Sequence, residues 1–155
     1  MSTTNTLGLG LGQYARYIPV AVTSVASFFG FFIAAQGVRG MLTPADYVPD
    51  FGLPDKQASN TAATRNDWRS NPWIFLTGAR NLSFGLGLLA FRAQNDVRAM
   101  GTLLLSGLIV SAADAYATWN VGIREKGWSH IYGSCVCSAM GVYLLSLSMR
   151  PLALY

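Results

Sequence analysis

Four long apolar stretches constrain the fold of this chain more than any other feature of its sequence. They run over residues 18–38, 72–92, 97–119 and 130–149. A helix of about 20 apolar residues is long enough to cross the hydrocarbon core of a bilayer. Only helices and closed barrels satisfy every backbone hydrogen bond there, and segments of this length favour helices. The sequence therefore predicts an all-α fold, a transmembrane four-helix bundle that forms a single domain over residues 1–155.

The composition agrees with a membrane protein and argues against several classes of function. Hydrophobic residues make up 52% of the chain and charged residues 12%, whereas soluble domains carry about 25% charged residues. The net charge of +4 is not gathered into a basic run, so we expect no nucleic-acid partner. Cys135 and Cys137 lack the spacing of a zinc site or a disulfide framework. We therefore predict a multi-pass membrane protein without metal or cofactor, in the endoplasmic reticulum if the chain is eukaryotic.

The polar connection over residues 40–71 predicts a cover between the first two spans. Its segment Thr43-Pro44-Ala45-Asp46 has the pattern of a helix start, with Thr at the N-cap and Pro at the first helical position. We expect a short helix near residues 44–49. Three aromatic residues, Tyr47, Phe51 and Trp68, suggest that this long loop folds back over the membrane-spanning helices.

Local signals also place the helix ends and one packing face. Asn71 can cap the second span, Asn95 or Asp96 the third, and Ser129 the fourth. Small residues recur at helical spacing along the first span, where they allow a neighbouring helix to approach closely. They are Ser27, Gly30, Ala34 and Gly37. Such a stripe serves packing within the chain or a homodimer equally well.

Arg80 is the most costly residue in the predicted spans. A guanidinium at that depth costs at least about 2.5 kcal/mol, so it needs a partner. Asp114 is the only carboxylate in the other apolar stretches. Up-and-down threading places Arg80 about 10 Å and Asp114 about 7–8 Å from the same membrane surface. Gln36 and His130 fall in that half of the bilayer too, which predicts one shared polar site.

The candidate site follows from these positions. We expect Asp114, Arg80 and His130 to be catalytic, with Asp114 as the base, His130 as the acid and Arg80 as the group that orients the others. Asp67 or Glu125 could reach in from a loop and replace His130 as the acid. The expected substrate-binding residues are Asn81, Gln36, Ser111, Thr77, Trp119 and Tyr116.

Five short motifs carry a resemblance to a known family. They are GVRGMLTP at 37–44, FGLP at 51–54, GARNL at 78–82, ADA at 113–115, and His130 at the start of the last span. Over about residues 20–150 the chain resembles small integral-membrane proteins of fungi and bacteria that are classed as a domain of unknown function. Some fungal members lie in biosynthetic clusters for polyketides and terpenoids. The resemblance implies an enzyme that opens or cyclises an epoxidised intermediate.

Three functions remain open at this point. The first is a cofactor-independent enzyme that acts on an epoxide of a lipophilic small molecule by acid–base catalysis, as an epoxide hydrolase, cyclase or isomerase. The second is a carrier or binding protein for a small lipophile, which would use the same cavity without chemistry. The third is a structural or accessory membrane subunit, in which Arg80 and Asp114 only hold two helices together. The expected partners are the lipid bilayer, a lipophilic small-molecule substrate and, for a homodimer, a second copy of the chain.

Overall fold

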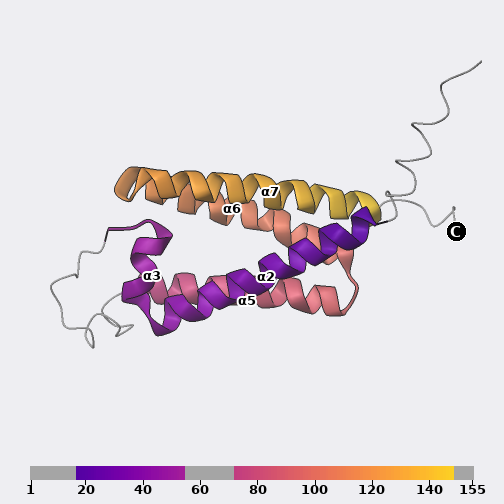
Figure 1. The fold of residues 1–155 in the computed structure, drawn as a ribbon, viewed down its shortest axis with the longest axis horizontal. Coiled ribbons are helices and arrows are strands. Elements are labelled where there is room, and N and C mark those ends of the chain that lie inside the picture. The colour runs from indigo at the N-terminus through magenta and orange to yellow at the C-terminus, as the bar shows by residue number, and fades with distance from the viewer. Residues whose placement is uncertain (1–16, 55–71, 149–155) are drawn as a thin grey trace, which may run out of the picture.

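The computed structural model describes residues 17–54 and 72–148. The described chain is entirely helical, which confirms the predicted all-α fold. Its five helices are α2 (Ile18–Leu42), α3 (Pro44–Phe51), α5 (Pro72–Ala93), α6 (Val97–Val121) and α7 (Arg124–Ser148). Figure 1 shows the four long helices running side by side, with α3 lying across one end.

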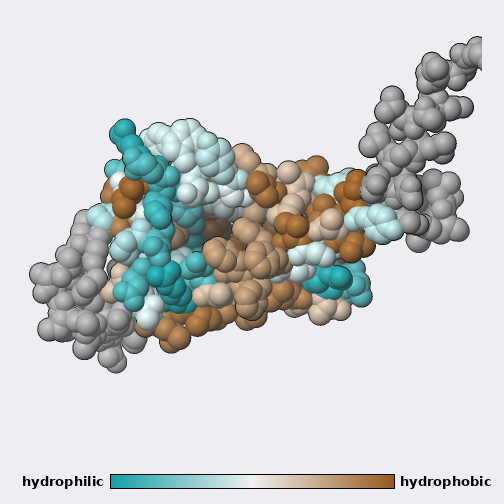
Figure 2. All heavy atoms as spheres, in the orientation of Figure 1, coloured by the Kyte–Doolittle hydropathy of each residue, from teal (hydrophilic) through white to brown (hydrophobic). Residues whose placement is uncertain are grey.

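The four long helices are all long and apolar enough to cross a membrane. Their outward faces carry large hydrophobic side chains, among them Phe28 (73% exposed) and Ile109 (79% exposed). Figure 2 shows hydrophobic residues over the middle of the molecule and hydrophilic residues at the α3 end. A soluble protein rarely exposes an apolar surface of this extent. The protein is therefore a multi-pass integral membrane protein.

The long helices are arranged as two closely packed pairs. One pair is α2 with α5 and the other is α6 with α7, and these two seams hold most of the contacts between helices. In Figure 1 the pairs converge at the end away from α3 and separate towards α3. The space between the pairs is therefore the feature that distinguishes the two ends of the bundle.

Glycine and alanine make the seam between α2 and α5. A Cβ atom on Gly78 would lie 2.7 Å from the Gly37 carbonyl oxygen, and one on Gly30 would lie 2.9 Å from the Cβ of Leu88. The seam between α6 and α7 is similar, since a Cβ on Gly101 would lie 2.9 Å from the Gly141 carbonyl oxygen. The small-residue stripe predicted on the first span thus packs within the chain. A homodimer stays a prediction.

Large side chains fill the space between the two pairs at the end away from α3. This core cluster consists of Ala26, Leu88, Met100, Leu104, Met140 and Leu144. Leu88, Met100 and Leu144 are completely buried. The cluster joins all four long helices and leaves the α3 end of the same space unfilled.

Most predicted helix ends are close to the observed ones, and one is wrong. Asp96 caps α6, because its Oδ1 accepts a hydrogen bond of 2.9 Å from the Ala99 amide. The fourth helix begins at Arg124 instead of His130, so Ser129 is not its cap. Gly127 lies within the helix, and its missing side chain allows α7 to pass close to Trp119, since a Cβ there would lie 3.3 Å from Trp119 Cε3. The predicted cap Asn71 lies outside the described residues.

The other helix boundaries differ by a few residues. The first span continues to Leu42 and the third to Val121, beyond the predicted residues 38 and 119. The short helix begins at Pro44 as predicted and continues to Phe51. Thr43 occupies its N-cap position, but its hydroxyl donates to the Arg39 carbonyl oxygen of the preceding helix instead. Thr43 therefore joins α2 to α3.

Candidate functional site

A cavity of about 280 Å³ lies between the two helix pairs at the α3 end. This volume is near the lower end of the range for small-molecule pockets. All five described helices contribute to its lining. The polar part of the lining consists of Gln36, Tyr47, Arg80, Asn81, Ser111, Asp114, Ser129, His130 and Ser134. The apolar part includes Phe29, Phe32, Ile33, Phe51, Phe84, Leu104, Leu108 and Val110.

Arg80 and Asp114 form an ion pair with two contacts across the space between α5 and α6. Arg80 Nη2 lies 2.8 Å from Asp114 Oδ2, and Nη1 lies 3.2 Å from Oδ1. The Asp114 side chain is 17% exposed and that of Arg80 35%. The paired geometry is the strongest form of an arginine–carboxylate contact. The structure thus confirms the predicted partner of Arg80.

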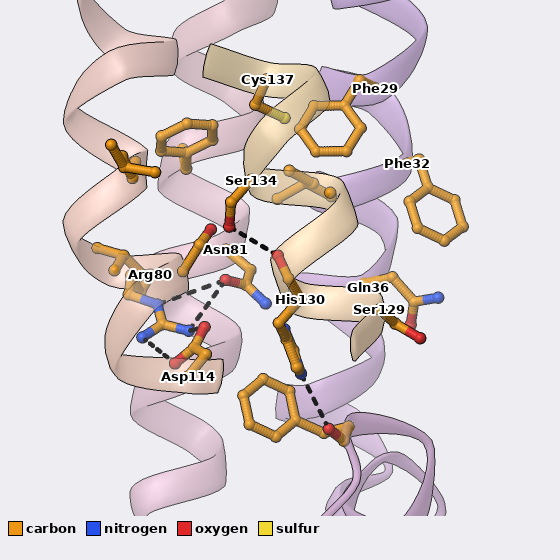
Figure 3. A pocket seen from close by; sticks show the side chains of 18 of the residues that line it. Phe29, Phe32, Gln36, Arg80, Asn81, Asp114, Ser129, His130, Ser134 and Cys137 are labelled. Atoms are coloured by element: carbon orange, nitrogen blue, oxygen red, sulfur yellow. Dashed lines mark hydrogen bonds and ion pairs between the residues drawn. The ribbon is translucent and has the colours of Figure 1, made fainter. Parts of the chain in front are cut away.

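Asn81 extends this pair towards α3. Its Oδ1 accepts hydrogen bonds from Arg80 Nε at 3.4 Å and Nη2 at 3.5 Å, as Figure 3 shows. Its Nδ2 then donates a hydrogen bond of 3.0 Å to the Tyr47 hydroxyl. Because a guanidinium offers only donors, the carbonyl oxygen of the amide has to face Arg80. The orientation of Asn81 is therefore fixed.

Tyr47 is a member of the site that the sequence reasoning missed. We expected it only as an aromatic residue of the cover, yet it is 5% exposed, lines the cavity and accepts a hydrogen bond from Asn81 at its hydroxyl. Burial raises the pKa of Tyr47 above its usual 10.0, although the hydrogen bond from Asn81 and the charge of Arg80 act in the opposite direction. The sequence feature that could have identified Tyr47 is its position in the first turn of the short helix predicted in the cover over the site.

His130 joins the far wall of the cavity to α3. Its Nε2 lies 3.1 Å from the Phe51 carbonyl oxygen, and the two rings are 4.9 Å apart between centroids. A carbonyl oxygen can only accept, so Nε2 carries the hydrogen. The Ser134 hydroxyl donates to the His130 carbonyl oxygen at 2.6 Å. Any proton that His130 gives to a ligand therefore comes from Nδ1.

Helix α3 lies across the end of the cavity and is attached to both helix pairs. Arg39 forms an ion pair with Asp50 on the α2 side. On the other side, the Gly52 carbonyl oxygen accepts a hydrogen bond of 2.8 Å from the amide of Ile123, in the turn between α6 and α7. Gly52 has φ +99°, a conformation that favours glycine and ends the helix. The described part of the predicted cover thus contacts the site, while Trp68 and Asp67 lie outside the described residues.

The remaining predicted site residues divide into two groups. Gln36 and Ser111 line the cavity, and Gln36 Oε1 is buried with no hydrogen-bond partner among the described residues. Thr77, Trp119 and Tyr116 are not part of the lining. Tyr116 is 73% exposed, because two residues along a helix from Asp114 rotate a side chain by about 200°. Trp119 instead packs against Trp128, with 5.3 Å between ring centroids.

The loop acid proposed as a substitute for His130 is also away from the cavity. Glu125 is exposed in the first turn of α7 and is not part of the lining. Within residues 17–54 and 72–148 there is no group of three or more His, Cys, Asp or Glu residues that could hold a metal ion. The polar part of the site thus combines the Arg80–Asp114 ion pair with amide, hydroxyl and imidazole side chains on the wall of a largely apolar cavity.

Comparison with known proteins gives one match. The model of a family described as a domain of unknown function, DUF4267, matches residues 30–144. The matched range contains every residue of the polar lining, all of α5 and α6, most of α7 and the second half of α2. No curated protein and no solved structure matches this chain.

Proposed function

This chain belongs to the DUF4267 family of unknown function, and we propose that it is a cofactor-independent membrane enzyme that opens or cyclises an epoxide on a lipophilic small molecule. The observation that carries the proposal is the Arg80–Asp114 ion pair on the wall of a cavity that is otherwise mostly apolar. Ionisable groups in a membrane-spanning segment are costly and commonly mark functional sites. Here they lie beside a space of suitable size for a ligand.

Epoxide opening needs a base for the attacking oxygen and a proton donor for the leaving oxygen. Asp114 takes a proton from a water molecule, or from a hydroxyl group of the substrate, while that oxygen bonds to an epoxide carbon. The carbon–oxygen bond of the epoxide breaks, and its oxygen takes a proton from Nδ1 of protonated His130. Water attack yields a diol, and internal attack yields a cyclic ether. Arg80 keeps its charge and holds the Asp114 carboxylate in place.

The resemblance to fungal membrane proteins of polyketide and terpenoid clusters supports an epoxide as the reacting group and a role in secondary metabolism. The walls of the cavity support a lipophilic substrate, since Phe29, Phe32 and Phe84 form part of them. An apolar wall with a few oriented polar groups is typical of sites that bind such molecules.

A carrier for a small lipophile is the second candidate, and one observation favours it. Phe32 and Leu108 line the cavity and are also 51% and 45% exposed. Exposed apolar side chains at the cavity would suit a ligand that enters and leaves without reacting. A carrier would bind or transfer the ligand at this site and release it unchanged.

The test uses membranes that contain the protein, a panel of lipophilic monoepoxides with and without an internal hydroxyl group, and water labelled with oxygen-18. Diol or cyclic ether is detected by mass spectrometry. We expect Asp114→Asn to lower the rate by about 10²- to 10⁴-fold. Asp96→Asn is the matched control, because Asp96 is exposed at the other end of the bundle and Asn also caps helices well. Product at an undiminished rate from folded Asp114→Asn, or binding without product, would contradict the proposal.

A further inference from the structure

We propose that the Tyr47 hydroxyl binds the ligand by donating a hydrogen bond to an uncharged acceptor oxygen. This inference rests on the proposed function for its substrate class and adds the group that recognises the oxygen. The geometry that carries it is a chain of hydrogen bonds from Asp114 through Arg80 and Asn81 to Tyr47. Each link of that chain has only one possible direction.

The direction is set at the charged end. Arg80 is donor-only and is held by the two oxygens of Asp114. The carbonyl oxygen of Asn81 therefore turns to Arg80, and its amide nitrogen turns to Tyr47. The Tyr47 oxygen is the acceptor of that last bond. The hydrogen of the phenol is consequently left to donate elsewhere.

Nothing in the described part of the chain takes that hydrogen. The bond from Asn81 is the one hydrogen bond of the Tyr47 hydroxyl within residues 17–54 and 72–148. Tyr47 is 5% exposed, and it lines the cavity. A buried donor without an acceptor is unfavourable. An acceptor atom on a molecule in the cavity would satisfy it.

The charges around Tyr47 indicate an uncharged acceptor. The guanidinium of Arg80 is already neutralised by Asp114 through two contacts, so Arg80 offers no unpaired charge to an anionic ligand. Burial of Tyr47 also raises its pKa, so the phenol keeps its proton as it polarises the acceptor. An epoxide, ether or ketone oxygen can accept this hydrogen bond without adding charge, whereas a carboxylate would bring a second negative charge into the site that already holds Asp114.

The test uses acetophenone labelled with carbon-13 at the carbonyl, added to the full-length protein in lipid nanodiscs. A hydrogen bond to the carbonyl oxygen moves the carbon-13 resonance downfield of its position in empty nanodiscs. We expect this shift with the unaltered protein and its loss in Tyr47→Phe, with binding weakened roughly three- to tenfold. Tyr116→Phe is the matched control, because Tyr116 is 73% exposed and outside the lining.

Tyr47→Phe could act by loosening α3, and Asp50→Asn separates this effect. That substitution weakens the ion pair with Arg39 that attaches α3 but keeps the phenol, so the downfield shift should persist. A shift retained in Tyr47→Phe, or no shift with the unaltered protein, overturns the inference. The proposed reaction is judged separately by product formation in Asp114→Asn, so the two can fail independently.

Discussion

The seams within each helix pair differ sharply from the space between the pairs. Within the pairs, glycines such as Gly37 and Gly78 bring backbones into contact and leave no room for a side chain. Between the pairs, large side chains fill one end and a cavity occupies the other. The close seams hold each helix pair together, whereas the space between the pairs is available for a ligand. Substitutions of the same kind should therefore have opposite consequences in the two regions.

The largest effect is expected from leucine at a seam glycine. A Cβ on Gly37 would overlap the backbone of α5 at Leu82 and Gly78, so Gly37→Leu should separate α2 from α5. We expect a loss of about 4 kcal/mol or more in the free energy of unfolding. The measurement is thermal or denaturant unfolding in detergent.

Gly133→Leu is the matched control for that change. Gly133 lines the cavity, and a Cβ atom there would meet nothing within 4 Å. The Gly133→Leu variant should gain less than about 1 kcal/mol in the free energy of unfolding, because leucine favours a helix more than glycine does. Equal losses of stability in both variants would show that the two regions do not differ.

A smaller effect is expected in the filled end of the space between the pairs. Leu88 is completely buried in the core cluster, so Leu88→Ala should cost about 3 kcal/mol through lost contacts and a new void. Leu108→Ala should cost less than about 1 kcal/mol, because Leu108 already borders the cavity and is 45% exposed. Denaturant unfolding of the two variants measures both values, and a reversed order would refute the division into a filled and an open end.

The ion pair gives the next effect and distinguishes a functional pair from a structural one. Arg80→Leu leaves the largely buried Asp114 carboxylate without its partner and should cost about 2 kcal/mol of stability. The double change Arg80→Leu with Asp114→Leu should restore most of that stability but not the turnover of an epoxide. If the stable double variant performed as well as the unaltered protein, the ion pair would have only a structural role, as in the accessory-subunit alternative.

The smallest effect is expected on the stability of the protein at alkaline pH, through the ionisation of Tyr47 in α3. The folded pKa of Tyr47 is raised above its usual 10.0, so the folded protein holds that proton more tightly than the unfolded chain. The resulting stability is fully present below pH 10 and is lost as pH rises above 10 through the folded pKa. Tyrosinate absorbance and unfolding measured together should show this loss, and Tyr47→Phe should remove it. A free energy of unfolding that does not change as pH rises above 10 would contradict this prediction.

The sequence predicted the fold and the charged pair because both follow from strong and simple costs. A buried guanidinium needs an anion, and Asp114 is the only carboxylate in the other apolar stretches. The small-residue stripe likewise predicted a close helix neighbour, which is now seen to be α5. These inferences need only the spacing of residues along each helix.

The rest of the site depends on how the helices are rotated and on where α3 lies, which spacing alone does not determine. Tyr116 and Trp119 were expected to bind the substrate, yet Tyr116 is 73% exposed and Trp119 packs on Trp128. Tyr47 was missed because its role requires α3 to approach Asn81 across 34 residues of sequence. The apolar walls gave no signal either, since Phe32 and Leu108 resemble any lipid-facing residue of a span.

The central claim is that a lipophilic epoxide reacts inside the cavity between the helix pairs. The most direct test is the rate of diol or cyclic ether formation by Gly133→Leu, measured at equal amounts of folded protein with the substrate that the unaltered protein turns over. The leucine side chain would enter the cavity without disturbing a helix seam. We predict that turnover falls at least about tenfold while stability is kept. Turnover equal to that of the unaltered protein would contradict the account, because the reaction could not then take place in this space.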